Sequence, residues 1–288
     1  MLKNPIVSVV IPTYNRECTI LRSIYSVLRQ DYKNIEIIII DDCSNDNTLE
    51  VINTINDSRL RVIPLKNNCG PSHARNIGIN ASNGEFLAFL DSDDEWLPFF
   101  IRESLSVINK ASSAATYTKY QINDGEIFPR YKELANFNSS TDKLTFLLFG
   151  NIIALPTLMF RRSVLVNFNG FDESLSAYED YDLLLRVLHS GKNIAFLDKV
   201  ALIVHRTEGG VNSNNKNIFT SLNRIREKNS LIIENNKHLT YFWNKNSLIY
   251  AVKSSSRIDL GSLLNLILSR YFYIDLFLIV RNFFYENK

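Results

Sequence analysis

Four short apolar runs alternate with amphipathic segments over the first ninety residues, and this alternation constrains the fold more than any other feature. The runs read IVSVVI (6–11), IEIIII (35–40), LRVIPL (60–65) and EFLAFL (85–90). Nearly continuous β-branched runs are typical of strands that are buried on both faces of a parallel sheet. The segments between them, 17–30, 45–55 and 72–82, have the spacing of helices. The sequence therefore predicts an α/β fold, βαβαβαβ, with a mostly parallel sheet flanked by helices.

Composition and charge exclude several classes of protein. The 288 residues are 45% hydrophobic, which is enough to bury a large core and argues against disorder over most of the chain. The net charge is only +2, so we expect no nucleic-acid partner. The charge is uneven, because residues 206–288 hold 12 Lys or Arg and 6 Asp or Glu, against 20 and 24 in the rest.

The cysteines and the N-terminus indicate the compartment. Cys18, Cys43 and Cys69 form no C-x-x-C pair, which argues against a disulfide framework or a zinc site. Residues 1–15 have too short an apolar stretch for a secretory signal, and they read instead as the first strand. We therefore expect a cytoplasmic protein.

Polar clusters follow each of the four predicted strands at the point where the strand ends. They read PTYNR (12–16), DDCSND (41–46), NNCGPSHARN (67–76) and DSDD (91–94). In open parallel sheets, ligands bind beyond the carboxyl ends of the strands, where such loops converge. We expect the four clusters to face one site.

The last cluster brings Asp91, Asp93 and Asp94 within four residues. Ionised carboxylates this close repel one another, and a divalent cation relieves the repulsion. Oxygen ligands suit Mg²⁺ or Mn²⁺. The alternative is an aspartate-rich turn that caps the next helix, which is the commoner explanation of an isolated D-x-D. The position after a buried strand, beside three other polar loops, favours the metal.

Four stretches in order resemble the inverting family 2 glycosyltransferases with the GT-A fold. They are VSVVIPTYNR (7–16), IIIIDDCSND (37–46), GPSHARNIGINASNGEFLAFLDSDDEW (70–96) and LMFRRSVLVNFNGFDESLSAYEDYDLLLRVL (158–188). The resemblance covers about residues 5–210. It implies a GT-A domain over 1–215, with a nucleotide-binding half (1–110) and an acceptor-binding half (111–215).

The resemblance also implies a role for individual residues on the donor side. The residues expected to bind the nucleotide-sugar are Thr13, Tyr14, Asn15, Asp42, Arg75, Asp91 and Ser92. Asp42 is expected to accept the N3–H of uracil or thymine, and its alternative is a turn or helix cap. Arg75 is expected to meet phosphate or base oxygens, and its alternative is a solvated helix arginine.

The metal ligands expected from the resemblance are Asp93, Asp94 and His205. Asp93 is expected to be the chief ligand of Mn²⁺ or Mg²⁺, with Asp91 toward the ribose and Asp94 in either role. His205 ends the apolar stretch 199–205 and is either an additional metal or diphosphate contact or a polar strand terminator.

The general base is expected at the start of the segment 176–188. Glu179, Asp180 and Asp182 precede an apolar helical pattern, and acids in a first turn also complement the helix dipole. In the family that the chain resembles, the residue matching Asp180 removes the proton of the acceptor hydroxyl.

Two parts of the second half keep alternative interpretations. Residues 114–131 predict a hairpin with a turn at Asp124 and Gly125. Trp96 is either a sugar-stacking platform or core packing. Residues 216–288 predict a helical extension. Within it, 260–288 is apolar and aromatic but interrupted by charges, which fits an amphipathic helix on the inner face of a membrane or an ordinary core or dimerisation helix.

Together these patterns predict an inverting, metal-dependent glycosyltransferase. It would move a sugar from a UDP- or dTDP-sugar to a glycan or lipid-linked acceptor in bacterial surface polysaccharide synthesis. The sequence is compatible with an oligomeric protein. One alternative is a non-catalytic nucleotide-sugar-binding scaffold, against which the full set of aspartates argues. A D-x-D-x-T phosphatase is disfavoured, because Glu95 stands where that motif needs Thr or Val.

Overall fold

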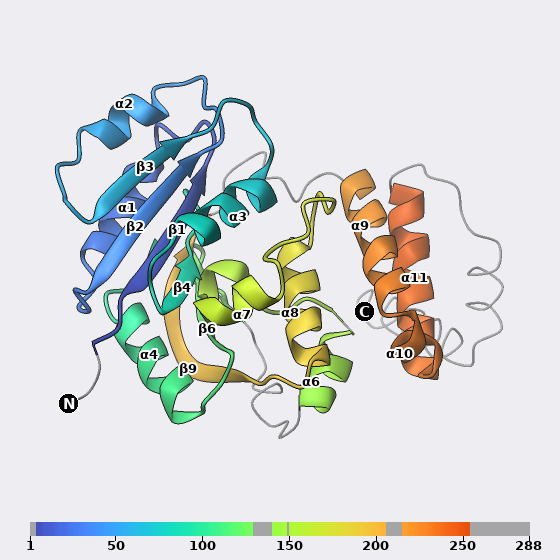
Figure 1. Cartoon of the computed structure of the whole chain (residues 1–288). Coiled ribbons are helices and arrows are strands. Elements are labelled where there is room, and N and C mark those ends of the chain that lie inside the picture. The colour runs from blue at the N-terminus through green and yellow to red at the C-terminus, as the bar shows by residue number, and fades with distance from the viewer. Residues whose placement is uncertain (1–3, 129–139, 149, 206–214, 254–288) are drawn as a thin grey trace, which may run out of the picture. The chain divides into compact units, whose positions relative to one another are not determined.

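A computed structural model describes residues 4–128, 140–148, 150–205 and 215–253 (Figure 1). The strands are β1 (Val7–Thr13), β2 (Ile35–Asp41), β3 (Leu60–Pro64), β4 (Phe86–Phe89), β5 (Glu95–Trp96), β6 (Ala115–Ile122), β7 (Ile127–Phe128), β8 (Leu158–Arg161) and β9 (Ile194–Val204). The helices are α1 (Ile20–Leu28), α2 (Thr48–Asn53), α3 (Pro71–Ala81), α4 (Phe100–Lys110), α6 (Ser140–Leu147), η1 (Leu155–Thr157), α7 (Arg162–Asn167), α8 (Glu179–His189), α9 (Asn215–Lys228), α10 (Ser230–Glu234) and α11 (Lys237–Lys253).

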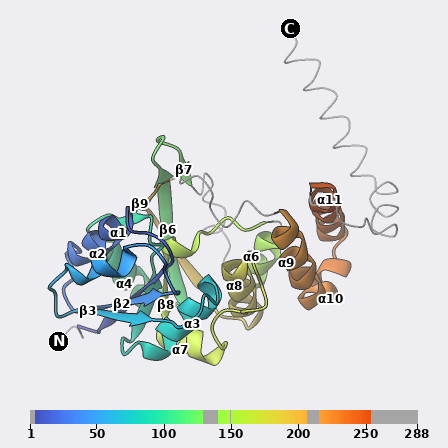
Figure 2. The ribbon, with the colours of Figure 1, turned by 90° about the horizontal axis from the view of Figure 1, so that it is seen from above.

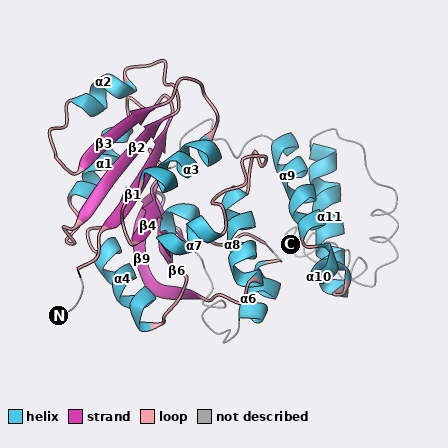
Figure 3. Ribbon diagram, in the orientation of Figure 1, coloured by secondary structure: helices cyan, strands magenta, loops and turns pink. Residues whose placement is uncertain are grey.

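The described strands form one sheet in the order β3-β2-β1-β4-β8-β6-β9-β5, with β7 paired to β6 (Figures 2 and 3). The neighbours β3, β2, β1 and β4 are all parallel, which confirms the predicted βαβαβαβ unit. Beyond β4 the sheet becomes mixed, because β8 runs antiparallel to both β4 and β6. The predicted α/β class is therefore confirmed, with parallel pairing in the first half and mixed pairing in the second.

Helices cover both faces of the parallel half. Val9 and Ile11 of β1 are fully buried in a core cluster with residues of α1, α2 and α4. Val10 points to the other face, where a Cβ built on Gly78 of α3 would lie 2.3 Å from Val10 Cγ1. Residues 37–40 are fully buried for the same reason, since apolar partners lie on both sides of the sheet. The continuous apolar runs thus reflect two covered faces.

The parallel strands end together at one edge of the sheet. Thr13 at the end of β1 is in register with Asp41 at the end of β2, and Asp41 is in register with Pro64 of β3. The loop before α3 and the turn after β4 follow strands of the same direction. The four polar clusters therefore share the carboxyl edge of the sheet, as the sequence predicts.

The structure decides two open interpretations in the second half. The hairpin of β6 and β7 is present, and Gly125 in its turn has a φ of 96°. Trp96 is buried, stacks on Phe100 with ring centroids 4.1 Å apart, and donates its indole N–H to the Pro156 carbonyl oxygen at 2.7 Å. Trp96 is therefore core packing, and the interpretation as a sugar platform is wrong.

The chain divides into two compact units, one of residues 1–174 and 179–208 and the other of residues 175–178 and 209–288. In the second unit α9, α10 and α11 confirm the predicted helices, and Arg226 of α9 donates to Asn244 Oδ1 of α11 at 2.7 Å. Among the described residues, no helix is both long and apolar enough to cross a membrane. The segment 260–288 lies outside the described residues, and the domain boundary at 215 stays a prediction.

Candidate active site

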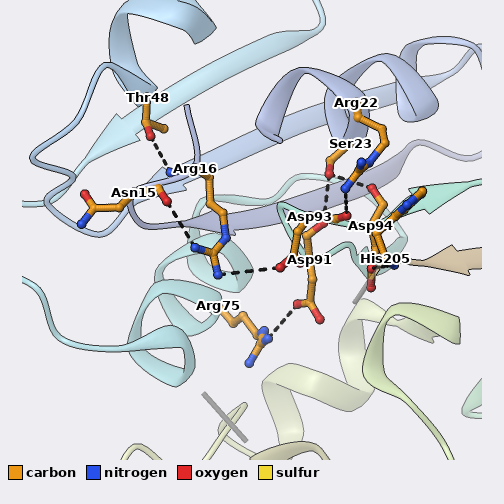
Figure 4. Close-up of polar contacts among 10 residues, drawn as sticks. All are labelled: Asn15, Arg16, Arg22, Ser23, Thr48, Arg75, Asp91, Asp93, Asp94 and His205. Atoms are coloured by element: carbon orange, nitrogen blue, oxygen red, sulfur yellow. Dashed lines mark hydrogen bonds and ion pairs between the residues drawn. The ribbon is translucent and has the colours of Figure 1, made fainter. Parts of the chain in front are cut away.

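The aspartate turn after β4 is held by side chains of α1 (Figure 4). The backbone N–H of Asp94 donates to the Asp91 carbonyl oxygen at 3.1 Å, which closes the turn. Ser23 Oγ lies 3.1 Å from that oxygen and 2.7 Å from the Asp94 carbonyl oxygen, and the Arg22 guanidinium donates to the Asp93 carbonyl oxygen. With its carbonyls engaged by α1, the turn can project its carboxylates toward the carboxyl edge of the sheet.

Each carboxylate of the turn has a described partner. Asp91 Oδ1 accepts from Arg75 Nη2 at 3.0 Å, and Asp93 Oδ2 lies 3.7 Å from Arg16 Nη2. Asp94 is buried and accepts the backbone N–H of His205 at 3.0 Å. Burial, and then the charge of Asp91, raise the pKa of Asp94 to about 8. Burial and a neighbouring negative charge thus both disfavour the ionised form of Asp94.

This donor set fits a divalent cation only in part. Among the described residues, no three His, Cys, Asp or Glu side chains are placed to hold a metal ion by themselves. Mg²⁺ and Mn²⁺ sites in nucleotide enzymes are commonly built from one or two carboxylates, completed by phosphate oxygens and water. The crowded carboxylates of Asp91, Asp93 and Asp94 suit such an open site.

His205 lies beside the turn because β9 pairs with β5 just beyond it. Glu95 and Trp96 of β5 are in register with Ile203 and Leu202 of β9. The His205 imidazole Nε2 lies 3.0 Å from Glu95 Oε1, and its side chain is 22% exposed. The structure thus brings His205 to the aspartate turn, and its role as a ligand stays a prediction.

The end of β1 and the loop after it contribute three residues predicted to bind the nucleotide-sugar. Thr13 is buried, and its Oγ1 has no hydrogen-bond partner among the described residues. Tyr14 is 40% exposed. Asn15 has a φ of 50°, and its backbone N–H donates to Ser44 Oγ at 2.9 Å. Its side-chain Oδ1 accepts the Asn45 N–H at 2.8 Å. Asn15 therefore joins the first two loops of the site.

Asp42 joins the second and third loops. Its carboxylate is buried and accepts the backbone N–H groups of Cys69 at 2.8 Å and of Gly70 at 2.7 Å. Gly70 has a φ of 87°, which explains the glycine before α3. A carboxylate has about four acceptor positions, so Asp42 retains capacity for a further donor. Ser92 is buried in the turn after β4.

Arg75 connects the two halves of the site. It is buried on α3, and Phe171 lies under its guanidinium at 5.7 Å. Arg75 Nη2 donates to Asp91, and Arg75 Nη1 donates to Glu179 Oε1 at 2.6 Å. Burial by itself lowers the pKa of Arg75, but the charges of Asp91 and Glu179 outweigh it, so the pKa is raised. Arg75 is not a solvated surface residue.

Asp180 directly follows Glu179 at the start of α8. Its Oδ1 accepts the backbone N–H of Tyr181 at 2.7 Å and the side-chain amide of Asn151 at 3.2 Å. Burial, and then the charge of Glu179, raise the pKa of Asp180 to about 7. A carboxylate with such a pKa can accept a proton near neutral pH.

Sequence reasoning missed three contacts of the site. Glu179 was explained only as a first-turn acid, whereas it is the link between Arg75 and α8. The contact of Asn151 with Asp180 spans 29 residues, and no local spacing indicates it. Arg16 ends the PTYNR cluster, and its position beside Asn15 was the signal in the sequence that it belongs to the site. Its ion pair with Asp93 appears only in the structure.

Comparison with known proteins places this geometry in a family. The family model for glycosyl transferase family 2 matches residues 8–167. The chain is 34% identical over 235 residues to the UDP-Glc:alpha-D-GlcNAc-diphosphoundecaprenol beta-1,3-glucosyltransferase WfaP of Escherichia coli, which covers 78% of this chain and 85% of WfaP.

Two solved structures share the fold. TarS of S. aureus (residues 1–349), in complex with UDP-GlcNAc, has a TM-score of 0.67 and 22% identity, covering 91% of this chain and 78% of that one. The mannosyltransferase PcManGT from Pyrobaculum calidifontis, in complex with GDP-Man and Mn²⁺, has a TM-score of 0.64 and 16% identity, covering 92% and 79%.

Proposed function

The chain belongs to glycosyl transferase family 2, and from that premise we propose that it transfers a sugar with inversion from a UDP- or dTDP-sugar to a lipid-linked glycan. One observation carries the proposal. Asp180, with a pKa near 7, follows a residue that Arg75 ties to the aspartate turn, so a base and a donor site adjoin. The setting would be surface polysaccharide assembly at the inner face of the membrane.

On the acceptor side, Asp180 takes the proton of the attacking hydroxyl. The hydroxyl oxygen forms a bond to the anomeric carbon from the face opposite the diphosphate, while the bond from that carbon to the phosphate oxygen breaks. The nucleoside diphosphate leaves, and the configuration inverts in this single displacement. The Asn151 amide and the Tyr181 N–H hold one oxygen of Asp180. The other oxygen is thereby oriented to receive the proton.

On the donor side, Thr13, Tyr14, Asn15 and Asp42 bind the base, and Asp91 lies toward the ribose. Ser92 and Arg75 are further contacts of the nucleotide-sugar. Asp93 would hold Mn²⁺ or Mg²⁺, with Asp94 and His205 as further ligands, and the ion would supply positive charge to the leaving diphosphate. Asp42 supports recognition of uracil or thymine, because its carboxylate can accept a hydrogen bond from their N3–H. In cytosine the N3 atom is itself an acceptor, so it cannot donate to Asp42.

The relatives support both substrates of the proposal. WfaP is named for a UDP-glucose donor and an acceptor linked to diphosphoundecaprenol. The TarS structure holds UDP-GlcNAc, and the PcManGT structure holds a nucleotide-sugar together with Mn²⁺. These likenesses favour a nucleotide-sugar donor and a lipid-linked acceptor for this chain.

The test compares the wild type with D180N, which keeps the size of the side chain but cannot accept the proton. With Mn²⁺, a panel of UDP- and dTDP-sugars and diphosphoundecaprenol-linked acceptors, we expect nucleotide release by the wild type. Release by D180N should fall about 10² to 10⁴-fold, because general-base catalysis contributes that much. UDP affinity, measured by calorimetry, should be unchanged. Analysis of the product by NMR should show the inverted anomer.

Two results would contradict the proposal. If D180N turns over like the wild type, Asp180 is not the base. If the wild type binds UDP-sugars but releases no nucleotide with any acceptor, the chain is the non-catalytic scaffold.

A further inference from the structure

Arg16 is a charged residue of the site for which the proposed reaction has no role. It follows Asn15 in the loop after β1, and its side chain extends toward the aspartate turn (Figure 4). Nη1 donates to the Asn15 carbonyl oxygen at 3.2 Å, and Nη2 lies 3.7 Å from Asp93 Oδ2. Nε is buried and has no hydrogen-bond partner in the part of the chain that the structure describes. The guanidinium is thus attracted to Asp93 without being fully hydrogen-bonded.

The backbone of Arg16 is fixed, so that only its side chain is able to change partner. Its N–H donates to Thr48 Oγ1 at 2.7 Å, and its carbonyl oxygen accepts the N–H groups of Thr19 and Ile20 at the start of α1. The next residue, Glu17, donates its N–H to Asp46 at 3.1 Å. These bonds hold the loop on both sides, and the side chain is 34% exposed.

Arg75 differs at its terminal nitrogens, although its Nε likewise has no hydrogen-bond partner among the described residues. Both of its terminal nitrogens make ion pairs, at 2.6 and 3.0 Å, and its side chain is only 8% exposed. Arg16 has one long ion pair, at 3.7 Å, and its Nε–H donor has no partner among the described residues. A guanidinium carries five N–H donors in a planar fork that matches phosphate oxygens. The geometry of Arg16 therefore suits a new ligand contact, whereas both terminal nitrogens of Arg75 are already engaged.

We propose that Arg16 binds the diphosphate of the donor, after serving as a counter-ion of Asp93 while the site is empty. A cation and the Arg16 guanidinium both seek the Asp93 carboxylate, so they compete for it. The diphosphate supplies a new anion for the displaced guanidinium. This inference rests on the proposed function, since it names the group that recognises the donor's phosphates.

Competition for Asp93 and attraction to phosphate have opposite consequences for the two ligands. Removing the guanidinium takes away a competitor of the cation, so binding of Mn²⁺ without nucleotide should be maintained or tightened. The same change removes charge-assisted hydrogen bonds to phosphate, so UDP binding should weaken. A purely structural clamp on the turn would instead loosen the carboxylates and weaken both.

The experiment uses the chain of residues 1–288 as the wild type, the variants R16A and R16K, and the matched control R59A. Arg59 also pairs with an aspartate, Asp57 at 2.8 Å, but it precedes β3 at the opposite edge of the sheet. Binding of Mn²⁺ alone is followed by the electron paramagnetic resonance signal of the free ion. Binding of UDP and of uridine, at saturating Mn²⁺, is followed by calorimetry and NMR titration.

We expect R16A to weaken UDP binding by about tenfold or more, because hydrogen bonds to charged groups are worth about 1.4 kcal/mol or more. Uridine binding should not change, R16K should lie between R16A and the wild type, and R59A should match the wild type. Mn²⁺ binding by R16A should be at least as tight as that of the wild type.

The inference is overturned if R16A binds UDP like the wild type, if it loses uridine as strongly as UDP, or if it loses Mn²⁺ binding. Each of these outcomes leaves the proposed function standing, provided that the wild type binds UDP. If the wild type binds neither UDP nor uridine, the proposed donor is wrong and the inference fails with it.

Discussion

Asp180 illustrates how neighbouring residues set the chemistry of a single side chain. Burial and the charge of Glu179 raise its pKa, whereas the Tyr181 N–H, the Arg75 guanidinium and the Asn151 amide lower it. The balance leaves the pKa at about 7, several units above that of an ordinary aspartate. A base with this pKa is deprotonated in about half of the molecules at neutral pH and still binds a proton strongly.

The first prediction concerns the pH dependence of transfer. Because only deprotonated Asp180 accepts a proton, kcat/KM should rise with pH up to about 7 and then level off. E179Q removes a charge that raises the pKa, so its acidic limb should move to lower pH. N151A removes a hydrogen bond that lowers the pKa, so its limb should move to higher pH. pH profiles of nucleotide release at saturating Mn²⁺ measure both shifts. If the acidic limbs of E179Q and N151A move in the same direction, Asp180 is not the group that sets the limb.

The second prediction concerns stability. The folded pKa of Asp180 lies above its unfolded value of about 3.9, so its contribution is fully present below that value and is lost as pH rises through 7. The loss is at most about 1.4 kcal/mol per pH unit. D180N does not undergo this loss, so its stability relative to the wild type should rise between pH 5 and pH 7. Above pH 7 the difference in stability between the two proteins should stay constant. Urea unfolding at pH 5 and pH 8 measures the gain.

D57N is the control for this experiment. The Arg59 side chain and backbone lower the pKa of Asp57 to about 2, so the stability that Asp57 contributes is present above pH 4 and is lost only as pH falls toward 2. D57N should therefore be destabilised by the same amount at pH 5 and pH 8. A gain in D180N that does not change with pH would show that Asp180 is not held as a high-pKa acid.

At the scale of elements, the contact of α3 with β1 positions Arg75. A Cβ at Gly78 would lie 2.3 and 2.8 Å from the two methyl carbons of Val10, far inside contact distance. Val10 lies in the middle of β1, three residues before Thr13, and Arg75 lies one helical turn before Gly78. The close approach of helix and strand therefore sets the distance between the β1 loop and the Arg75 link.

The third prediction follows from this contact. G78A should destabilise the protein by about 1 to 3 kcal/mol, because the added methyl group overpacks a rigid β-branched neighbour. Alanine would otherwise favour a helix by about 1 kcal/mol, so the sign of the effect reports the contact. The double variant G78A/V10A should lose less unfolding free energy than the sum of the losses in G78A and V10A, because V10A makes room for the added methyl group. Urea unfolding measures all four proteins, and a stabilised G78A would contradict the packing.

At the scale of the whole molecule, the uneven charge and the apolar tail of the sequence allow a test of membrane binding. Residues 206–288 carry twice as many basic as acidic side chains, and the tail 260–288 is rich in apolar and aromatic residues. The acceptor named for WfaP carries a diphosphoundecaprenol group. A basic, amphipathic segment binds anionic lipid through both apolar burial and charge.

The fourth prediction tests this segment. The full chain should sediment with vesicles that contain phosphatidylglycerol, less with pure phosphatidylcholine, and less again at high salt. A chain that ends at Lys253 should remain in the supernatant while keeping its UDP affinity. If both chains remain in the supernatant, the membrane interpretation of 260–288 is wrong. Sedimentation velocity would then show whether removal of the tail dissociates an oligomer.

The sequence alone determined the alternating strands and helices of the first half and the edge at which the polar loops gather. These features can be read from short stretches, because the continuous runs 7–11 and 37–40 are buried on two faces and DSDD directly follows its strand. It also indicated a base at Asp180 through a family resemblance. How these residues contact one another could not be obtained in this way.

Only the tertiary structure decided which elements meet. It placed β8 antiparallel between β4 and β6, and it buried Trp96 in the core. It also set Arg75 between Asp91 and Glu179, although Arg75 and Glu179 are 104 residues apart. Contacts over such separations depend on how whole elements pack, and a spacing along the chain carries no record of that packing.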